Sequence, residues 1–449
     1  MNSRTIAKTS IGALAVAVIG VLAAWPAAAQ PEGVEAATLD LARQPAQTGW
    51  ATQDGGTSGG ARATDDAIHV VDSRAELVKA LGGDNATNAD NDTPAIILVS
   101  GTIDLTEDDN GNPLTAEDFA DPEYNWEAYV RAYDPATYGM EKEPEGPLEE
   151  ARARSQKNQA AHTVINIGSN KTIFGLGGDA VVKNGTFNID GVSNVIVRNI
   201  HFQDSYDLFP AWDGTDGDEG NWNSEYDLIQ VRESDHVWID HNTFTDGDRP
   251  DDREPEVFGR RVQHHDGAVD IVNGSNFVTV SWNHVQNHDK THLIGSSDSR
   301  ETDRGHLKVT LHHNFYENSS QRNPRVRYGQ VHAFNNLYVN SGDTHYTHNY
   351  IFGLGVESAI LSEANVFEMP ASVPEAEMLS HYKGTVFRDE GSLFNGKPAK
   401  LLQAFKEANP DLQISEEIGW SPPYDYTIDP VEKVAELVRG GAGAGTLAK

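Results

Sequence analysis

The sequence predicts an all-β fold in which the chain winds into a parallel β-helix, a solenoid decorated by helices and loops. One short motif recurs along the middle of the chain, each copy has the two-residue periodicity of a β-strand, and each strand ends near the same polar residue. Repetition of a strand and a bend every few tens of residues is typical of a solenoid, and the short strands favour the β-helical kind.

The repeated motif reads apolar, any, small or apolar, two residues, Asn, any, large apolar. Its asparagines are Asn242, Asn283, Asn314, Asn336 and Asn365. A weaker copy, Val195 to Phe202, carries Ile200 in the Asn column. An Asn side chain bonds readily to backbone in a bend, so we expect these amides to stack along the coils and satisfy one another.

The spacing of the Asn column indicates where functional loops leave the coils. From position 200 the intervals are 42, 41, 31, 22 and 29 residues, and the shortest is near the length of a bare coil. The longer coils must carry loops. Because neighbouring coils stack about 4.8 Å apart, charged residues in successive intervals can meet on one outer face.

The beginning of the chain predicts an export signal over residues 1–29. Arg4 and Lys8 precede an apolar run from Ile11 to Ala24, and Ala27 to Ala29 form a small-residue cleavage site before Gln30. The apolar run is too short for a stable membrane span. We expect a secreted, extracellular protein without membrane association, with residues 30–449 forming one β-helical domain.

Further elements follow in chain order. The pattern predicts a strand and an amphipathic helix from Val70 to Leu81, and the first solid strand of the coil from Ile96 to Ile103. A charged, helix-prone stretch over about 106–161 is expected to be an external helical insertion without chemistry of its own. The segments Val164 to Ile167 and Lys171 to Phe174 resume the coil.

Composition narrows the class of function. The absence of cysteine excludes a disulfide-stapled fold, so stability must come from a large core. The formal net charge is −34, yet Lys290, Arg322, Arg325 and Arg327 gather in one stretch. Cations concentrated against such a background indicate a local site for an anion. We expect no nucleic-acid partner and a monomer.

An acidic cluster accompanies these cations. Asp266 and Asp270 face the same side of a strand with only Ala268 between them, and Asp227 closes the segment 221–227. Such carboxylates repel unless a cation lies among them, and oxygen ligands without Cys or a His triad favour Ca²⁺ over zinc. The alternative is that they are ordinary solvated acids in a chain with 68 of them.

The numerous histidines could instead suggest a transition-metal site. They occupy repeat and loop positions without ligand spacing, so we expect hydrogen bonds within the coil instead. The residues concerned are His241, His264, His265, His312 and His313.

Three separated motifs resemble those of the pectate lyase family of polysaccharide lyases. They are Trp238 to His241, His288 to Lys290 and Arg322 to Gly329, and the resemblance runs in order from about Gly49 to the C-terminus. It implies a right-handed parallel β-helix and a C-terminal segment, from Gly419 onward, that lies back along the helix.

The resemblance also implies a site and a reaction. Asp227, Asp266 and Asp270 match the family's calcium ligands, and Asp216 is a plausible further ligand when substrate is present. The substrate would be (1→4)-α-D-galacturonan, cleaved by β-elimination to 4,5-unsaturated oligogalacturonides, a reaction that needs a base but no nucleophile or paired hydrolase carboxylates.

In this reaction the resemblance makes Arg322 the base, while Lys290 and Arg327 hold uronate carboxylates and Arg325 has no assigned role. Guanidinium normally stays protonated. We expect Lys290, Arg327 and calcium to penalise the cationic form of Arg322.

Two alternatives stay open at this stage. A pectin lyase would act on the methyl-esterified polymer without calcium, but a neutral ester needs neither the Asp cluster nor Lys290. A non-catalytic β-helical adhesin or polysaccharide-binding module would not require Arg322, and would form no product.

Overall fold

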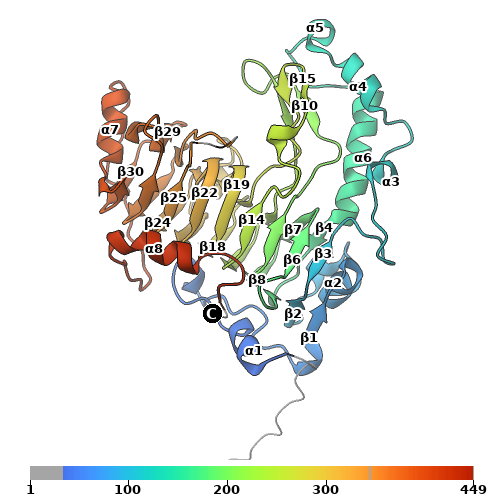
Figure 1. The fold of residues 1–449 in the computed structure, drawn as a ribbon, viewed down its shortest axis with the longest axis horizontal. Coiled ribbons are helices and arrows are strands. Elements are labelled where there is room, and N and C mark those ends of the chain that lie inside the picture. Colours follow the sequence, from blue (N-terminus) through green and yellow to red (C-terminus); the bar gives the residue numbers. More distant parts are fainter. Residues whose placement is uncertain (1–33, 343, 345, 448–449) are drawn as a thin grey trace, which may run out of the picture.

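The chain is a stack of parallel coils whose strands form three long sheets (Figure 1). The computed structural model describes residues 34–342, 344 and 346–447, so the predicted leader at residues 1–29 lies outside the described residues. All strand pairs within these three sheets are parallel except β31 with β32. The predicted parallel β-helix is confirmed.

Each sheet takes one strand from successive coils. The first contains β1 (Ile68–Val71), β2 (Ala95–Val99), β5 (Lys171–Gly175), β8 (Ser193–Arg198), β13 (Asp235–Asp240), β18 (Asn276–Ser281), β21 (Lys308–His312), β24 (Gln330–Phe334), β27 (Ala359–Glu363) and β30 (Phe387–Glu390). The second contains β3 (Thr102–Asp104), β6 (Val181–Lys183), β9 (His201–Gln203), β14 (Thr243–Thr245), β19 (His284–Lys290), β22 (Phe315–Gln321), β25 (Leu337–Val339), β28 (Val366–Glu368), β31 (Leu393–Phe394) and β32 (Lys397–Pro398). The third contains β4 (Val164–Asn166), β7 (Thr186–Asp190), β12 (Ile229–Arg232), β17 (Val269–Val272), β20 (Leu293–Ile294), β23 (Arg325–Val326), β26 (Phe352–Leu354) and β29 (Leu379–His381).

Helices and two small hairpins decorate this body. The helices are α1 (Ala36–Ala42), α2 (Arg74–Leu81), α3 (Ala116–Phe119), α4 (Trp126–Ala132), α5 (Pro135–Tyr138), α6 (Pro147–Thr163), α7 (Leu401–Ala408) and α8 (Val431–Gly441). Short 3₁₀ turns are η1 (Trp50–Thr52), η2 (Asp65–Ala67), η3 (Asn88–Asp90), η4 (Asp251–Arg253), η5 (Glu301–Asp303) and η6 (Glu375–Met378). The hairpins pair β10 (Ala211–Asp213) with β11 (Asn221–Asn223) and β15 (Glu256–Val257) with β16 (Arg260–Arg261). None of the described helices is long and apolar enough to cross a bilayer.

The core lies inside the coils, where alternate side chains of each strand point. In β13 both Val237 and Ile239 are fully buried, and each pairs in register with a buried valine of β18. Aromatic residues of the second sheet stack from coil to coil, with ring centroids of Tyr316 and Tyr338 4.9 Å apart. Burying a side chain of this size contributes about 1.5–3 kcal/mol, so the repeated apolar positions account for a stable solenoid without disulfides.

The predicted asparagine column forms a continuous ladder. From Asn242 to Asn336, each amide nitrogen donates to the amide oxygen of the next coil, at 3.1 Å from Asn242 to Asn283 and 3.0 Å from Asn314 to Asn336. Each amide oxygen also accepts from the backbone N–H of the coil before, including Ile200 N to Asn242 Oδ1 at 3.0 Å. The ladder fixes the bend between the first and second sheets.

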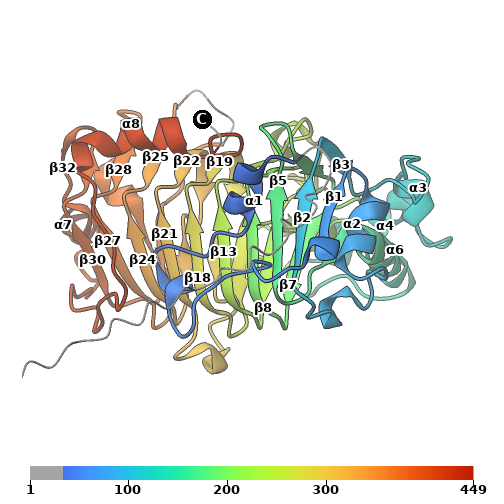
Figure 2. The same ribbon diagram turned by 90° about the horizontal axis from the view of Figure 1, so that it is seen from below.

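The C-terminal segment runs back along the coils, as the resemblance implied. Trp420 donates to Ala359 O, α8 packs beside β25 and β28, and Gly445 N reaches Asn199 Oδ1 at 2.8 Å (Figure 2). The N-terminal segment crosses the same first sheet, where Trp50 N donates to Thr310 Oγ1 at 2.9 Å. The two terminal segments thus both lie over the outside of the first sheet, and α8 continues onto the second sheet.

The stretch 106–161 contains α3, α4 and α5 and most of α6 on the outside of the coil, at one end of the molecule (Figure 1). Aromatic residues of α4 form a buried cluster with Trp212 and Trp222 of the β10–β11 hairpin. Helix α6 also contacts the loops before β12, because Tyr226 donates to Gln156 O at 2.9 Å. The insertion therefore supports the loops that carry part of the acidic cluster.

Candidate functional site

The predicted site residues gather where strands of the second sheet lead into strands of the third. Lys290 ends β19 and Arg322 follows β22, and these strands are paired so that Lys290 lies opposite Gln321. Gly267, between Asp266 and β17, forms a bridge with Lys290 on the adjacent coil. Residues separated by tens of positions in the chain are therefore neighbours on one outer edge.

Asp227 and Asp270 converge on Gly267. A Cβ added at Gly267 would lie 2.4 Å from Asp270 Oδ1 and 2.6 Å from Asp227 Oδ1. The Gly267 N–H donates to Asp227 Oδ1 at 2.8 Å, and the Leu293 N–H donates to Asp270 Oδ1 at 2.9 Å. Only glycine leaves room for both carboxylates at this point.

Asp227 and Asp270 repel each other in a buried setting. Burial and the repulsion of Asp270 and Asp266 raise the pKa of Asp227 well above its usual range. Burial and the repulsion of Asp266 raise the pKa of Asp270 to about 7. Two buried carboxylates that repel each other are a favourable place for a positive ion.

Asp266 differs from the other two because it faces cations. Its Oδ1 accepts from Lys290 Nζ at 2.9 Å, and Lys290 also donates to Gln263 Oε1 at 3.2 Å. Burial raises the pKa of Asp266, but the attraction of Lys290 and Arg322 outweighs it and lowers the pKa. Lys290 itself is 8% exposed, so this ion pair is largely enclosed.

Arg322 has a different electrostatic environment from the one expected. Burial lowers the pKa of its guanidinium, but the attraction of Asp266 and Asp270 outweighs burial and raises it. Lys290 repels the charge of Arg322 as expected, but in the protein alone the two carboxylates are the stronger neighbours. The buried Nε of Arg322 has no hydrogen-bond partner among the described residues, and the residue adopts φ of +57°.

Arg327 and Arg325 point outward from the third sheet on either side of buried Val326. Arg327 Nε forms an ion pair with Asp298 Oδ1 at 2.7 Å, and its terminal nitrogen donates to Gly295 O at 2.9 Å. The Arg325 guanidinium carbon lies 3.9 Å from the centre of the Tyr382 ring. Arg327 is therefore held by the loop that follows β20, and Arg325 by an aromatic ring.

Asp216 lies apart from the other predicted ligands. It occupies the exposed turn of the β10–β11 hairpin, where its N–H donates to Asp213 O at 3.4 Å. None of its recorded contacts within the described residues joins it to Asp227, Asp266 or Asp270. The structure thus brings three of the four predicted acids together.

The carboxylate oxygens of the acidic cluster are suitable ligands for Ca²⁺, although they do not form a complete coordination shell. Within the described residues, no group of three His, Asp or Glu side chains has the geometry of a metal site. Two carboxylates converge on Gly267, and hard oxygen ligands of this kind are those that Ca²⁺ prefers. The third carboxylate, Asp266, is turned to Lys290.

Histidines lie beside the site as hydrogen-bonded supports, as the sequence suggested. His265 bridges Asp204 at 2.9 Å and Asp251 at 2.8 Å, and His288 Nδ1 bonds Asp246 at 2.5 Å. Burial lowers the pKa of His265, but Asp246, Asp204 and Asp251 outweigh it and raise the pKa to about 10. These bonds fix the loop before β17 that contains His265 and Asp266.

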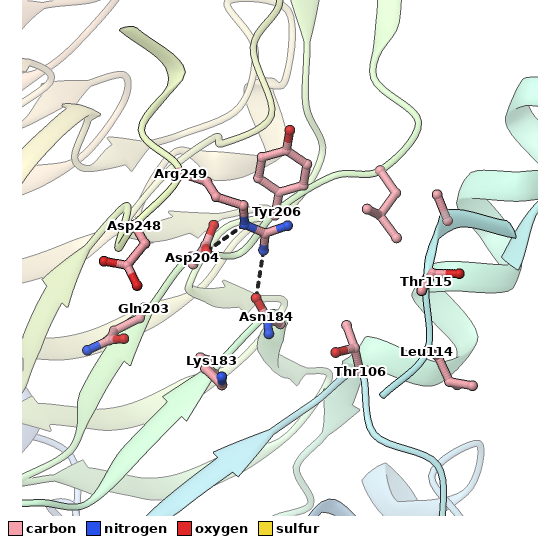
Figure 3. A pocket seen from close by; sticks show the side chains of 12 residues that line it. Thr106, Leu114, Thr115, Lys183, Asn184, Gln203, Asp204, Tyr206, Asp248 and Arg249 are labelled. Atoms are coloured by element: carbon pink, nitrogen blue, oxygen red, sulfur yellow. Dashed lines mark hydrogen bonds and ion pairs between the residues drawn. The ribbon is translucent and has the colours of Figure 1, made fainter. Parts of the chain in front are cut away.

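A cavity of about 550 Å³ lies beside the same coils, against the helical insertion (Figure 3). Its cations are already paired. Arg249 lies over Tyr206 and bonds Asp204 at 2.9 Å, and Lys183 pairs with Asp104 at 3.2 Å. This cavity contains none of the predicted site residues.

Sequence reasoning missed several residues that hold the site. Gln263, Asp298 and Tyr382 contact Lys290, Arg327 and Arg325 respectively. All three lie in loops between coils, outside the repeated motif. Gly267 could have been recognised as the glycine between Asp266 and Asp270, but nothing in the sequence marked the other three.

Comparison with known proteins gives consistent matches. The family model described as pectate lyase matches residues 145–446. The pectate lyase of Bacillus subtilis is 45% identical over 419 residues, covering 93% of this chain and 96% of the relative. A solved thermostable pectate lyase is 47% identical with a TM-score of 0.89, covering 91% of this chain and 99% of the other. A solved pectate lyase bound to a hexasaccharide is 46% identical with a TM-score of 0.85, covering 91% and 100%.

Proposed function

Because the chain belongs to the pectate lyase family, we propose that it is a secreted, calcium-dependent enzyme that cleaves polygalacturonate by β-elimination and leaves 4,5-unsaturated oligogalacturonides. It is a polysaccharide lyase, as its relatives are. One observation supports calcium dependence and β-elimination. The Asp227 and Asp270 carboxylates converge, and beside them the cations Lys290 and Arg322 surround Asp266.

Polygalacturonate carries a carboxylate next to the C5 hydrogen of each sugar. Removing that proton puts negative charge on the carboxylate, and the glycosidic oxygen at C4 then leaves. Ca²⁺ held by Asp227, Asp266 and Asp270 would act as a Lewis acid towards the uronate carboxylate. Lys290, which adjoins Asp266, would add a second positive contact.

Arg322 is the proposed base. Its Nε is enclosed and has no hydrogen-bond partner among the described residues. No hydrogen bond of this nitrogen within the described residues therefore has to break before Arg322 acts as a base. Asp266 and Asp270 favour its charged form in the protein alone. Once those carboxylates are neutralised, that attraction is removed and burial favours the neutral base.

Arg327 would grip a uronate carboxylate from the neighbouring outward position, with Asp298 fixing its side chain. A guanidinium presents a planar fork that matches a carboxylate, and prior fixation lowers the entropy lost on binding. Asp216 would join a substrate-bound calcium ion only by movement of its exposed turn.

A pectin lyase acting on the esterified polymer is the second candidate, and the buried acids weigh against it. Two convergent carboxylates with raised pKa values cost stability, and a neutral ester gives no reason for that cost. A non-catalytic binding module is excluded by membership of a lyase family.

One assay tests the proposal. Purified protein is incubated with polygalacturonate, with calcium or with excess chelator, and absorbance of the conjugated double bond is followed. We expect absorbance to rise with calcium, to stop on chelation and to return when calcium is restored. Full activity in excess chelator would revive the pectin lyase alternative, and saturated products would refute elimination.

Secretion is tested separately. Mass spectrometry of protein from the culture medium should place the N-terminus at Gln30 or a close neighbour. Recovery of a species beginning at Met1 would contradict cleavage of the leader.

A further inference from the structure

The cavity beside the helical insertion has no role in the proposed reaction, yet three separate segments build it (Figure 3). Lys183 and Gln203 line it from the ends of β6 and β9, where the two residues pair in register. Leu114 and Ala116 line it from the insertion, and Arg249 from the loop after β14. Its volume of about 550 Å³ lies within the usual range of ligand sites, about 300–1,000 Å³.

The charges around the cavity cancel. Lys183 and Arg249 contribute two positive charges to its lining, and Asp204 and Asp248 contribute two negative charges. Asp104, which is not part of the lining, pairs with Lys183 at 3.2 Å. The cavity therefore presents no net positive charge that would attract an anion such as a uronate.

Arg249 belongs to the wall of the cavity. Its guanidinium donates to Asp204 at 2.9 Å and to Asn184 at 2.7 Å, and lies 3.9 Å from the centre of the Tyr206 ring. Asn184 in turn donates to Asp104 at 2.8 Å. These contacts hold the wall in shape before a ligand arrives, and such preorganisation lowers the entropy cost of binding.

Gln203 and Asp248, by contrast, have polar groups to offer. The Gln203 amide nitrogen lies 3.3 and 3.4 Å from the two nitrogens of the His201 ring, which is longer than a typical hydrogen bond. Asp248 forms no hydrogen bond or ion pair with any described residue. The amide both donates and accepts, and the carboxylate accepts. With apolar Leu114 and Leu208 in the same lining, these groups suit the hydroxyls and the apolar ring faces of a sugar.

We infer that this cavity binds a neutral saccharide, of the kind carried as side branches on pectic polymers. The inference goes beyond the proposed function, because it involves none of the residues assigned to Ca²⁺ or to proton transfer. The cavity adjoins the site, since Asp204 in its lining bonds His265, the chain neighbour of Asp266. A branched polymer can thus occupy both places, and two linked contacts bind more tightly than either alone.

Ligand-observed NMR titration of the calcium-loaded protein with galactotetraose tests the inference. This neutral oligosaccharide has no carboxylate and is not a substrate for the proposed elimination. We expect saturable binding in the millimolar range. Gln203→Ala should weaken that binding about tenfold, because the variant loses the donor and the acceptor of one amide.

Gln286→Ala is the matched control. Gln286 follows a buried residue of β19, as Gln203 follows a buried residue of β9 in the same sheet. Gln286 does not line the cavity, so the control should keep the wild-type Kd. Both variants should cleave linear polygalacturonate at the wild-type rate, whereas only Gln203→Ala should raise KM for a pectic polymer with neutral branches.

A second variant, Ala116→Trp, fills the cavity from the opposite wall and should abolish galactotetraose binding. It decides the question if Gln203→Ala lowers Tm. Absence of saturable binding to the wild type, or wild-type binding by both cavity variants, would overturn the inference.

Competition tests the preference for a neutral ligand. With excess chelator present, tetragalacturonate should leave galactotetraose bound, and displacement would overturn the assignment of a neutral saccharide. Absence of unsaturated product from the wild type would refute the proposed reaction alone, because the galactotetraose comparison does not depend on catalysis.

Discussion

Removing one rung of the asparagine ladder, by Asn314→Ala, should destabilise the protein far more than an ordinary polar substitution. The Asn314 amide is fully buried. Its Oδ1 accepts from Asn283 N at 3.0 Å and Asn283 Nδ2 at 3.1 Å, and its Nδ2 donates to Val280 O at 2.9 Å and Asn336 Oδ1 at 3.0 Å.

The magnitude follows from these four bonds. At about 1 kcal/mol each they contribute about 4 kcal/mol, and the Asn283 N–H left buried without a partner adds about 1 kcal/mol or more. We therefore expect a loss of roughly 4–6 kcal/mol in the free energy of unfolding, on the same principle. The pair of substitutions Asn314→Ala and Asn336→Ala should cost less than the sum of the singles, since the two side chains share a bond.

Urea unfolding followed by circular dichroism measures this loss. Asn112→Ala is the control, because the Asn112 amide is exposed and bonds only Asp108 within a surface turn. It should change stability by no more than about 0.5 kcal/mol. A loss for Asn314→Ala as small as that of the control, with an unchanged denaturant slope, would refute the view that the ladder stabilises the stack.

Three further predictions concern the site. Arg322→Lys should lower kcat by orders of magnitude while calcium and oligogalacturonate binding survive, because lysine keeps the charge but displaces the base; near-normal kcat would exclude Arg322 as the base. The raised pKa of Asp270, about 7, means that metal-free protein loses stability as pH rises from about 4 to about 7, by up to about 4 kcal/mol; Asp270→Asn should flatten that profile in thermal unfolding, and an unchanged profile would contradict the assignment. The raised pKa of His265, about 10, means that its ion pairs stabilise the fold fully below pH 6.5 and are lost as pH rises through about 10; His265→Gln should remove that alkaline loss.

The repeated part of the fold was predictable from the sequence because its signal is local. The alternation in segments such as Val237 to Ile239, and the Asn that follows, depend only on neighbours in the same coil. The ladder then follows from stacking. The prediction that Asp266 and Asp270 lie on one strand is wrong, because β17 begins at Val269 and Asp266 lies in the loop before it, paired with Lys290.

The contacts between side chains of different coils could not be predicted from the sequence as readily. Lys290 pairs with Asp266 because Gly267 and Lys290 lie opposite each other on adjacent coils. That register depends on the length of the loop in each coil. Arg327 pairs with Asp298 from a loop that has no repeat. The upward pKa shift of Arg322 required knowing that Asp266 and Asp270 both face its guanidinium. Sequence spacing alone does not give these distances.

The position of both terminal segments over the first sheet has a consequence for the order in which the molecule is completed. Trp50 N bonds Thr310, Ala51 N bonds Thr279, and Thr48 bonds Asp425 O near the opposite end of the chain. If the chain crosses a membrane with its N-terminus first, this segment emerges before any of its partners exist. The Thr48–Asp425 contact can close only when residue 425 is present, so it is among the last contacts that the molecule can complete.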